Sequence, residues 1–214
     1  MDVVVDNLDV FALGMRTTVS LTLLSFGIAF VIGTVVAACR VSPIPPLRFA
    51  GSLYVESVRN TPLTVLFVLF FFGLTKVGIK YSAFTTAIIV LGGYTGAFVA
   101  ETVRAGINAV SQGQAEAARS LGLTFGQVLR IVVLPQALRT VVAPIGGLFI
   151  ALIKNSSIAS IIAVEDLVFR TDDLVNDTAQ AIPIYLGAAI AYLLLTIPSG
   201  LAFGVLERRV AIKR

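Results

Sequence analysis

The residue types that carry out most enzyme chemistry are scarce in this chain, which excludes several kinds of active site. Its 214 residues contain no histidine and a single cysteine, Cys39. A histidine-based catalytic triad, a histidine proton relay, a histidine-ligated metal site and a disulfide within the chain are therefore excluded. No G-x-x-x-x-G-K-[ST] sequence is present, so there is no P-loop for nucleotide phosphates. We expect no cofactor or metal in this chain and no nucleic-acid partner, and we expect a partner protein to bind any ATP and magnesium.

One charged side chain stands in an unusual place. Lys154 lies well inside Thr140–Ala163, an apolar segment long enough to cross a membrane, and is followed by Asn155, Ser156 and Ser157. A lysine at membrane depth costs roughly 2.5–3.5 kcal/mol on insertion scales, which makes it a functional-site candidate. It lies about eight residues, or roughly 12 Å, from the outer end of the segment, which is far for snorkelling. We predict that Lys154 lines a substrate path, with snorkelling as the alternative. The three polar residues after it either line the same path or join helices.

The segment Ser111–Pro135, SQGQAEAARSLGLTFGQVLRIVVLP, is the longest one without a membrane-spanning pattern. It begins with Gln112–Leu121, which is rich in the helix-forming residues Ala, Glu, Gln and Arg. Gly122 follows at the position where helices end, because glycine adopts the left-handed backbone conformation without steric cost. The pattern predicts a short helix that ends in a tight turn.

A second helix is predicted directly after this turn. Thr124 and Gln127 have the spacing of a capping box, in which each side chain bonds to the backbone N–H of the other residue. We expect this helix to run through Val133. Pro135 has no N–H to donate, so it should stop or kink the helix. The whole segment is therefore predicted to be a helical hairpin, 111–135.

The first helix of this hairpin has a surface suited to close contact. Glu116 lies beside two methyl-sized side chains, Ala117 and Ala118, which leave room for another surface to approach the backbone. With the glycine four residues later and the apolar run that ends in Leu-Pro, this pattern resembles the EAA loop of ABC-transporter permeases. In that family the loop is cytoplasmic and docks onto the ATP-binding subunit; the alternative is a helix–turn–helix linker with chance alanines. The resemblance implies a coupling site made of Glu116, Ala117, Ala118, Gly122, Leu134 and Pro135.

The composition indicates an integral membrane protein. Hydrophobic residues make up 57% of the chain, the mean hydropathy is +0.95, and only 13% of residues are charged, against about 25% in soluble domains. About 20 apolar helical residues cross a bilayer. We expect an all-α fold with five transmembrane helices and a cytoplasmic coupling hairpin. The predicted segments are an external N-terminus at 1–16, a transmembrane domain at 17–207 with spans at 17–38, 61–77, 82–103, 140–163 and 184–206, and a basic cytoplasmic tail at 208–214.

The second span is the least regular of the five. We predict that Phe49–Asn60 is an amphipathic entry segment at the membrane interface. Glu56 and Arg59 lie one helical turn apart and are able to pair. Pro62 marks either a kink or the first turn of the span.

Two further patterns concern the neighbouring segments. Gly92, Gly96 and Ala100 recur every four residues in the third span, which allows a neighbouring helix to come close. Glu165–Asp177 is strongly acidic and is predicted to be an external loop.

The distribution of Lys and Arg predicts the orientation, because cytoplasmic loops carry the excess of positive charge. With the N-terminus outside and the C-terminus inside, eleven basic residues lie on the cytoplasmic side and four lie outside. This orientation places the hairpin in the cytoplasm. We expect the chain to cross the cytoplasmic membrane of a bacterial cell. The inner residues are Arg40, Arg48, Arg59, Arg104, Arg119, Arg130, Arg139, Arg208, Arg209, Lys213 and Arg214, and the outer ones are Arg16, Lys76, Lys80 and Arg170.

The resemblance extends from about Ala12 to Arg209, and it is strongest to permease subunits of polar amino-acid ABC importers. The pieces GQAEAARSLGL, LIKNSSIASII and ERRVAIK are similar to glutamate-uptake permeases of actinobacteria. The resemblance implies a type I importer with ATPase subunits, an extracytoplasmic solute-binding protein and a second permease subunit, a paralogue being favoured over a copy. The implied substrate is glutamate, ahead of glutamine.

Two other classes remain open at this stage. An ion-coupled secondary carrier for amino acids often shows internal repeats and intramembrane acids. This chain has no evident inverted repeat, and its acids near the spans stand at their ends. A membrane scaffold subunit would need neither an intramembrane lysine nor the hairpin.

Overall fold

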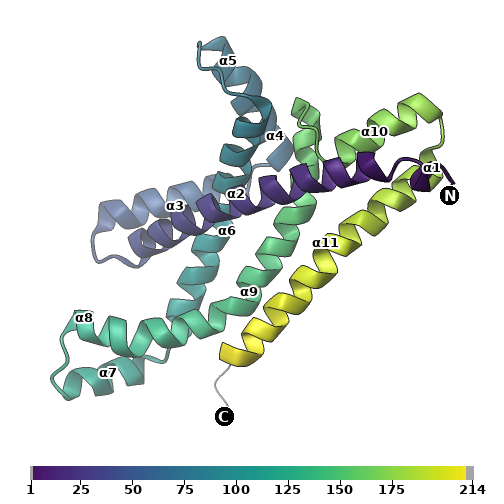
Figure 1. The fold of residues 1–214 in the computed structure, drawn as a ribbon. Helices are drawn as coiled ribbons and strands as arrows, with labels where there is room; N and C mark the ends of the chain where they lie inside the picture. Colours follow the sequence, from purple (N-terminus) through teal and green to yellow (C-terminus); the bar gives the residue numbers. More distant parts are fainter. Residues whose placement is uncertain (1, 211–214) are drawn as a thin grey trace.

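The computed structural model describes residues 2–210, which form helices and short connections without a strand in that range (Figure 1). Four segments are long and apolar enough to cross a membrane, and a bent pair of helices makes a fifth. This confirms the expected all-helical membrane fold. The four are α2 (Leu8–Val41), α6 (Ala83–Asn108), Val128–Ile162 with α9 (Leu134–Asn155) inside it, and α11 (Ala181–Val210), and the pair is α3 (Pro45–Arg59) with Leu63–Lys76.

Shorter elements join these helices. They lie at the N-terminus, in the second span, in the hairpin and on the external side of the last two spans. Their bounds are α1 (Asp2–Val5), α4 (Leu63–Val68), a π-helix (Leu69–Gly73), α5 (Leu74–Lys76), α7 (Gln112–Ser120), α8 (Phe125–Gln127), a second π-helix (Val128–Val133), a 3₁₀ helix (Ser156–Ile162) and α10 (Leu167–Thr178).

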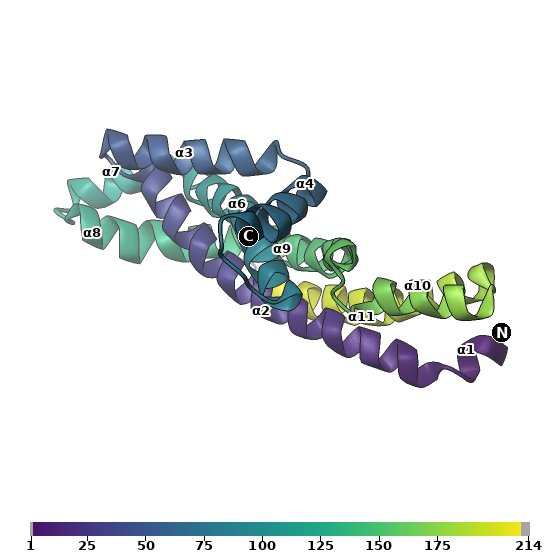
Figure 2. The same ribbon diagram turned by 90° about the horizontal axis from the view of Figure 1, so that it is seen from above.

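The most buried span, α6, packs closely against α2 (Figures 1 and 2). Small residues make this approach possible. A Cβ on Gly33 of α2 would lie 2.4 Å from Val99 Cγ1, and one on Gly92 would lie 2.8 Å from Ile28 Cγ2. The predicted close packing of the third span is confirmed, and its neighbour is the first span.

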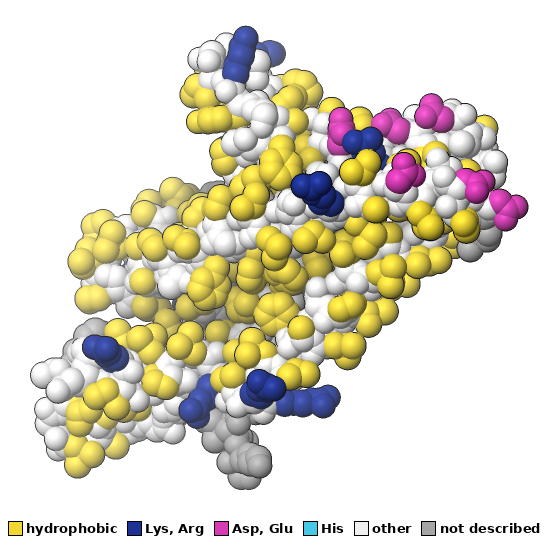
Figure 3. Space-filling model, in the orientation of Figure 1, with side chains coloured by type: hydrophobic (Ala, Val, Ile, Leu, Met, Phe, Trp, Pro, Cys, Tyr) yellow, Lys and Arg dark blue, Asp and Glu magenta, His cyan; other side chains and the backbone are white. Residues whose placement is uncertain are grey.

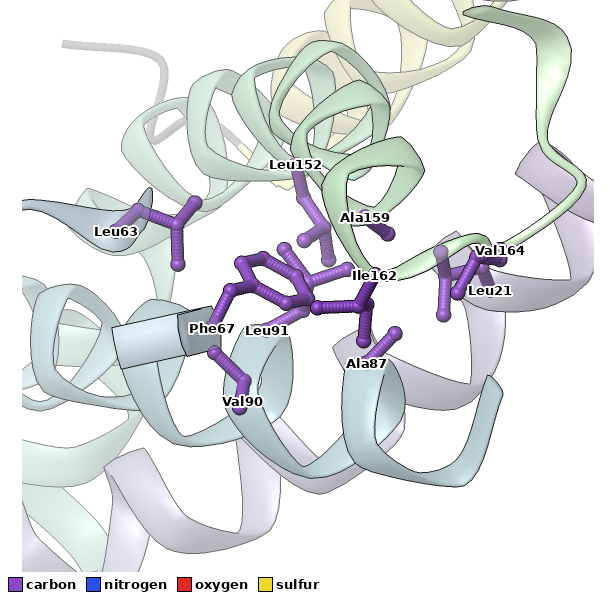
Figure 4. Packing of buried hydrophobic residues seen from close by; sticks show 10 residues of the cluster. All are labelled: Leu21, Leu63, Phe67, Ala87, Val90, Leu91, Leu152, Ala159, Ile162 and Val164. Carbon is purple, nitrogen blue, oxygen red and sulfur yellow. The ribbon is translucent and has the colours of Figure 1, made fainter. Parts of the chain in front are cut away.

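The largest apolar core joins α4, α6, α9 and the 3₁₀ helix (Figure 4). The ring of Phe67 from α4 is fully buried among Leu91 of α6, Leu152 of α9 and Ile162 of the 3₁₀ helix. Side chains before and after the break at Ser156 therefore share one core, which holds the end of α9 in place.

The second span is broken rather than straight. The chain leaves α3 at Asn60 and starts α4 after Pro62, with a bend of 103° between the two parts. This confirms the expected role of Pro62 as a kink or helix start. At 1.5 Å per residue, Leu63–Lys76 is roughly 21 Å long, short of the roughly 30 Å of a bilayer's hydrocarbon core.

The helices are longer than the predicted spans, and one predicted loop is a helix. α2 starts at Leu8, so most of the predicted external N-terminus is helical. The backbone hydrogen bonds of a helix continue past the point where its apolar residues end. The acidic stretch Glu165–Asp177, predicted as a loop, contains α10 instead. Asp166 caps this helix by accepting a hydrogen bond from Phe169 N at 2.9 Å.

Candidate functional site

The hairpin has the predicted shape. α7 ends at Ser120, and Gly122 makes the turn with a φ of +83°. Ala118 is buried under the hairpin, whereas Glu116 and Ala117 are exposed. The glycine turn is thus confirmed, and a charged and methyl-sized surface faces outward.

Leu121 at the tip of the hairpin was missed by sequence reasoning. Its side chain is 82% exposed, although the hairpin carries no apolar membrane-spanning pattern. A single exposed apolar side chain is common on protein surfaces, but at the tip of a hairpin that leaves the spans it is placed where another protein can contact it. The sequence did place Leu121 directly before the turn at Gly122, and it follows the last residue of α7.

The second leg of the hairpin starts with the predicted capping box. Thr124 N donates to Gln127 Oε1 at 2.8 Å, and Gln127 N donates to Thr124 Oγ1 at 3.4 Å. A π-helix, Val128–Val133, follows and continues into α9. Pro135 therefore does not stop the helix. The wide π turn relieves the clash of its ring with the carbonyl four residues earlier.

The hairpin is attached to the spans by a tight contact and lies beside a hollow. A Cβ on Gly106 of α6 would lie 2.3 Å from Val141 Cγ1 and 3.1 Å from the carbonyl of Ala137, so α6 and α9 touch there. A hollow of about 380 Å³ lies on the hairpin side of this contact. Its lining includes Val110, two residues after the end of α6, and Val133 from the π turn.

Four charged residues from three helices meet on one side of α6, and sequence reasoning did not bring them together. Glu101 pairs with Arg40 from α2, with Arg104 from its own helix and with Arg59 from α3. The Arg59 Nη1 to Glu101 Oε2 distance is 3.9 Å, and the Arg40 side chain is only 9% exposed. Arg59 is the loosest and most exposed of the three partners.

The predicted pair of Glu56 and Arg59 is wrong. Glu56 instead accepts a hydrogen bond from Asn60 Nδ2 at 3.4 Å. The direction of α3 across α6 brings Arg59 over α6, where Glu101 and the ring of Phe98 hold it. Its Cζ lies 5.2 Å from the centroid of the Phe98 ring, a cation–π distance.

Phe98 also lines a hollow of about 240 Å³ between α6 and α9. Thr95 from α6 and Asn155 from α9 contribute the polar side chains, and Tyr94 and Leu148 are among the apolar ones. The hollow therefore offers an apolar wall, hydroxyl and amide groups, and a guanidinium group next to one of its lining rings.

The four predicted substrate-path residues do not lie in one surface. Asn155 lines the hollow, and Lys154, at the end of α9, is exposed. Ser156 is fully buried and donates to the carbonyl of Ile153 at 2.8 Å, and Ser157 donates to that of Lys154 at 2.7 Å. The two serines thus bond to the turn that starts the 3₁₀ helix.

The acidic side chains gather at one end of the molecule. They lie over α10 and the N-terminal helix with some basic ones among and beside them, and further basic side chains lie near the hairpin and the end of α11 (Figure 3). Basic side chains are also seen at the tip of α5. An apolar belt separates the two ends, as a chain that spans a membrane requires.

Comparisons with known proteins agree with this arrangement. Residues 18–212 match the family described as binding-protein-dependent transport system inner membrane component. The chain is 38% identical to the probable glutamine ABC transporter permease protein GlnM of Bacillus subtilis, covering 98% of this chain and 97% of that one. It is 40% identical to the glutamate transport system permease protein GluC of Corynebacterium glutamicum, covering 92% of each.

A solved structure extends the likeness to three dimensions. The crystal structure of an amino acid ABC transporter with histidines contains a chain 36% identical to this one, with a TM-score of 0.92 over 96% of both. The ABC type-1 permease fold is thereby confirmed, and a secondary carrier is not favoured. The chain belongs to the family of inner membrane components of binding-protein-dependent transport systems, and it is a permease subunit of an ABC importer.

Proposed function

We propose that this permease moves glutamate or glutamine into the cell and that its hairpin receives the driving force from a separate ATPase. The relatives named above are glutamine and glutamate permeases, which supports a polar amino acid as substrate. The observation that carries the proposal is the hairpin itself, with the exposed Leu121 at its tip beside Gly122. ATP and magnesium bind to the ATPase, and this chain holds neither.

The coupling surface consists of the residues that the EAA resemblance named. Glu116 and Ala117 on α7 face outward, and Ala118 supports them from below. Gly122 sets the angle of the tip, while Leu134 and Pro135 join the hairpin to α9. A movement of the tip is then transmitted through the second leg of the hairpin to α9, which lines the hollow of about 240 Å³.

The substrate path runs along the hollow between α6 and α9. Asn155 offers an amide to the substrate, and Lys154 stands at the outer end of the same helix. Arg59 approaches the hollow from the Phe98 side, where only one long ion pair to Glu101 competes for it. A substrate carboxylate in the hollow therefore has a cation beside the path, because Arg59 lies against the lining ring of Phe98 without lining the hollow itself. Ser156 and Ser157 hold the turn that positions Lys154 and Asn155.

The surrounding assembly follows from the family and from the charges. The permease pairs with a second permease subunit, a paralogue or a second copy, and ATPase subunits lie beneath the hairpins. The N-terminus is outside and the C-terminus inside, so the acidic end of the molecule faces the solute-binding protein. Orientation is supported by the sequence, which assigns eleven basic residues to the cytoplasmic side and four to the external side; two of the eleven, Lys213 and Arg214, lie outside the described residues.

The experiment is uptake by proteoliposomes that contain the permease, its ATPase and its binding protein. We expect uptake of labelled glutamate or glutamine that requires ATP. Uptake that needs an ion gradient and no ATPase would contradict the proposal.

Two substitutions test the path within the same assay. Arg59→Gln removes a charge-assisted bond worth about 1.5–3 kcal/mol, so we expect KM for substrate to rise by about tenfold to a hundredfold. Lys154→Met should lower transport while membrane insertion and ATPase binding persist. Arg48→Gln is the matched control, because Arg48 is an exposed arginine on the same helix as Arg59. Parent-like kinetics in both path variants would remove them from the path.

A further inference from the structure

A buried carboxyl group lies on the external side of the molecule, outside the sites described above. Asp166 connects the 3₁₀ helix to α10 and is fully buried. One carboxyl oxygen, Oδ1, accepts the bond from Phe169 N at 2.9 Å that caps α10. The other, Oδ2, has no hydrogen-bond partner among the described residues. One carboxyl oxygen of Asp166 therefore caps the helix, and the other is buried without a partner.

The surroundings of Asp166 are tightly packed. The next residue, Leu167, donates its backbone N–H to Thr18 Oγ1 of α2 at 3.2 Å. A Cβ on Gly14 of α2 would lie 2.8 Å from Leu167 Cα. The hydroxyl of Tyr192 from α11 is also buried without a partner in the part of the chain that the structure describes. Asp166 thus lies where α2, α10, α11 and the 3₁₀ helix meet.

The charges around this junction do not favour an ionised carboxyl. Burial raises the pKa of Asp166 to about 7, and the negative charge of Asp172 adds to this, while the backbone N–H groups of Phe169 and Val168 act in the opposite direction. The nearest basic side chain of α10, Arg170, is paired with Glu165. The Nε of Arg170 is buried without a hydrogen-bond partner, and among residues 2–210 no cation is paired with Asp166.

The side chains that the other elements bring to this junction are neutral hydroxyls. Tyr192 of α11 lies near Asp166, and Thr18 of α2 and Ser157 of the 3₁₀ helix lie near the hydroxyl of Tyr192. Burying an ionised carboxylate with a bare oxygen in such a place is unfavourable, so the packed junction favours the protonated acid.

We propose that Asp166 is a proton-linked lock that holds α10 against α2 and α11 on the external side of the permease. With the acid neutral, the junction is closed. When the junction opens to water, Asp166 releases its proton. Opening and proton release are therefore linked, and a rise in external pH up to about 7 favours the open junction.

The sign of the pH dependence follows from the two states. In the closed junction the pKa of Asp166 is raised to about 7, whereas in the open junction it returns to the ordinary value of 3.8. Stability of the closed junction is complete below pH 3.8, falls as pH rises, and levels off above about 7. Within that window one proton is released per opening, so the closing constant changes by up to about tenfold per pH unit.

The test compares thermal unfolding of the purified permease–ATPase complex between pH 5 and 8. Asp166→Asn keeps the oxygen that caps α10 and cannot ionise, so the fall in Tm between about pH 5 and 7 should be lost or reduced. Asp173→Asn removes the same charge from an exposed position on α10 and should keep the parent profile. Identical profiles in the parent and in Asp166→Asn would overturn the lock.

A second measurement detects the proton directly and uses a different substitution. Infrared difference spectra of the parent complex between pH 5 and 8 should show the loss of one protonated buried carboxyl, and Asp166→Ser, which retains a capping oxygen, should lack that signal. An unchanged signal in Asp166→Ser would assign the proton to another acid and overturn the proposal.

Discussion

At the scale of single residues, Gly122 has the best-defined role in the hairpin. A Cβ at this position would meet nothing within 4 Å, so the effect of a substitution comes from the φ of +83° alone. A β-branched residue costs on the order of 1 kcal/mol or more there. We predict that Gly122→Val inserts into the membrane but retains less ATPase in a pull-down assay.

The control for this prediction uses the same position. Asn adopts the left-handed conformation more readily than other non-glycine residues, so Gly122→Asn should bind the ATPase nearly as well as the parent. Equal retention of the ATPase by Gly122→Val and the parent would show that the angle of the tip is unimportant.

At this scale, the sequence predicted contacts between residues close together in the chain better than contacts between different helices. Gly122 and the Thr124–Gln127 cap involve residues three to four positions apart, and local spacing predicted both. Arg59 was assigned to the nearby Glu56, although the path of α3 across α6 places it against Glu101. The burial of Asp166 likewise results from four elements meeting, which no local pattern indicates.

At the scale of helices, the contact between α2 and α6 predicts a difference between two glycines of α2. A Cβ on Gly33 would lie 2.4 Å from Val99 Cγ1, whereas one on Gly27 would meet nothing within 4 Å. Overpacking typically costs about 1–3 kcal/mol. We predict that Gly33→Ala lowers the Tm of the purified permease and that Gly27→Ala leaves it unchanged. Equal melting of both variants would mean that the contact relaxes without cost.

The π-helix Val128–Val133 is predicted to be the hinge of the hairpin. It lies between the α6–α9 contact at Gly106 and the hairpin tip, beside the hollow of about 380 Å³ that leaves it room to move. In a Cys39→Ser background, a disulfide between cysteines at Val110 and Val133 should block uptake without releasing the ATPase, and reduction should restore uptake. The two single-cysteine variants are the controls. Full uptake by the oxidised protein would exclude this hinge.

Helices were predictable where hydrophobicity is continuous and less so where it is not. The runs in α2, α6 and α11 are apolar over more than a bilayer's thickness, so their existence was clear from composition. α10 was predicted as a loop because its acidic residues concealed a short helix whose cap, Asp166, was the available signal. The π-helix before Pro135 results from the way the backbone accommodates the proline, and no pattern of side chains predicts it.

At the scale of the whole molecule, the separation of charge predicts its orientation. In a Cys39→Ser background, a cysteine at Asp173 on the exposed side of α10 should react with an impermeant maleimide in intact cells. One at the exposed Gln114 of α7 should react only after permeabilisation. The reverse labelling pattern would invert the molecule and place the hairpin outside, away from any cytoplasmic ATPase.

The central claim, that the hairpin couples ATP hydrolysis to transport, is tested most directly by measuring uptake and ATP hydrolysis together in proteoliposomes. Glu116→Lys reverses a charge on the exposed side of α7, and Asp173→Lys makes the same change in charge at the other end of the molecule. We predict that Glu116→Lys loses uptake, with hydrolysis either lost or no longer tied to transport. Asp173→Lys lies on the end that faces the binding protein, so it should keep ATP hydrolysis tied to transport even where the rate of uptake falls. Parent-like uptake and hydrolysis in Glu116→Lys would contradict the account.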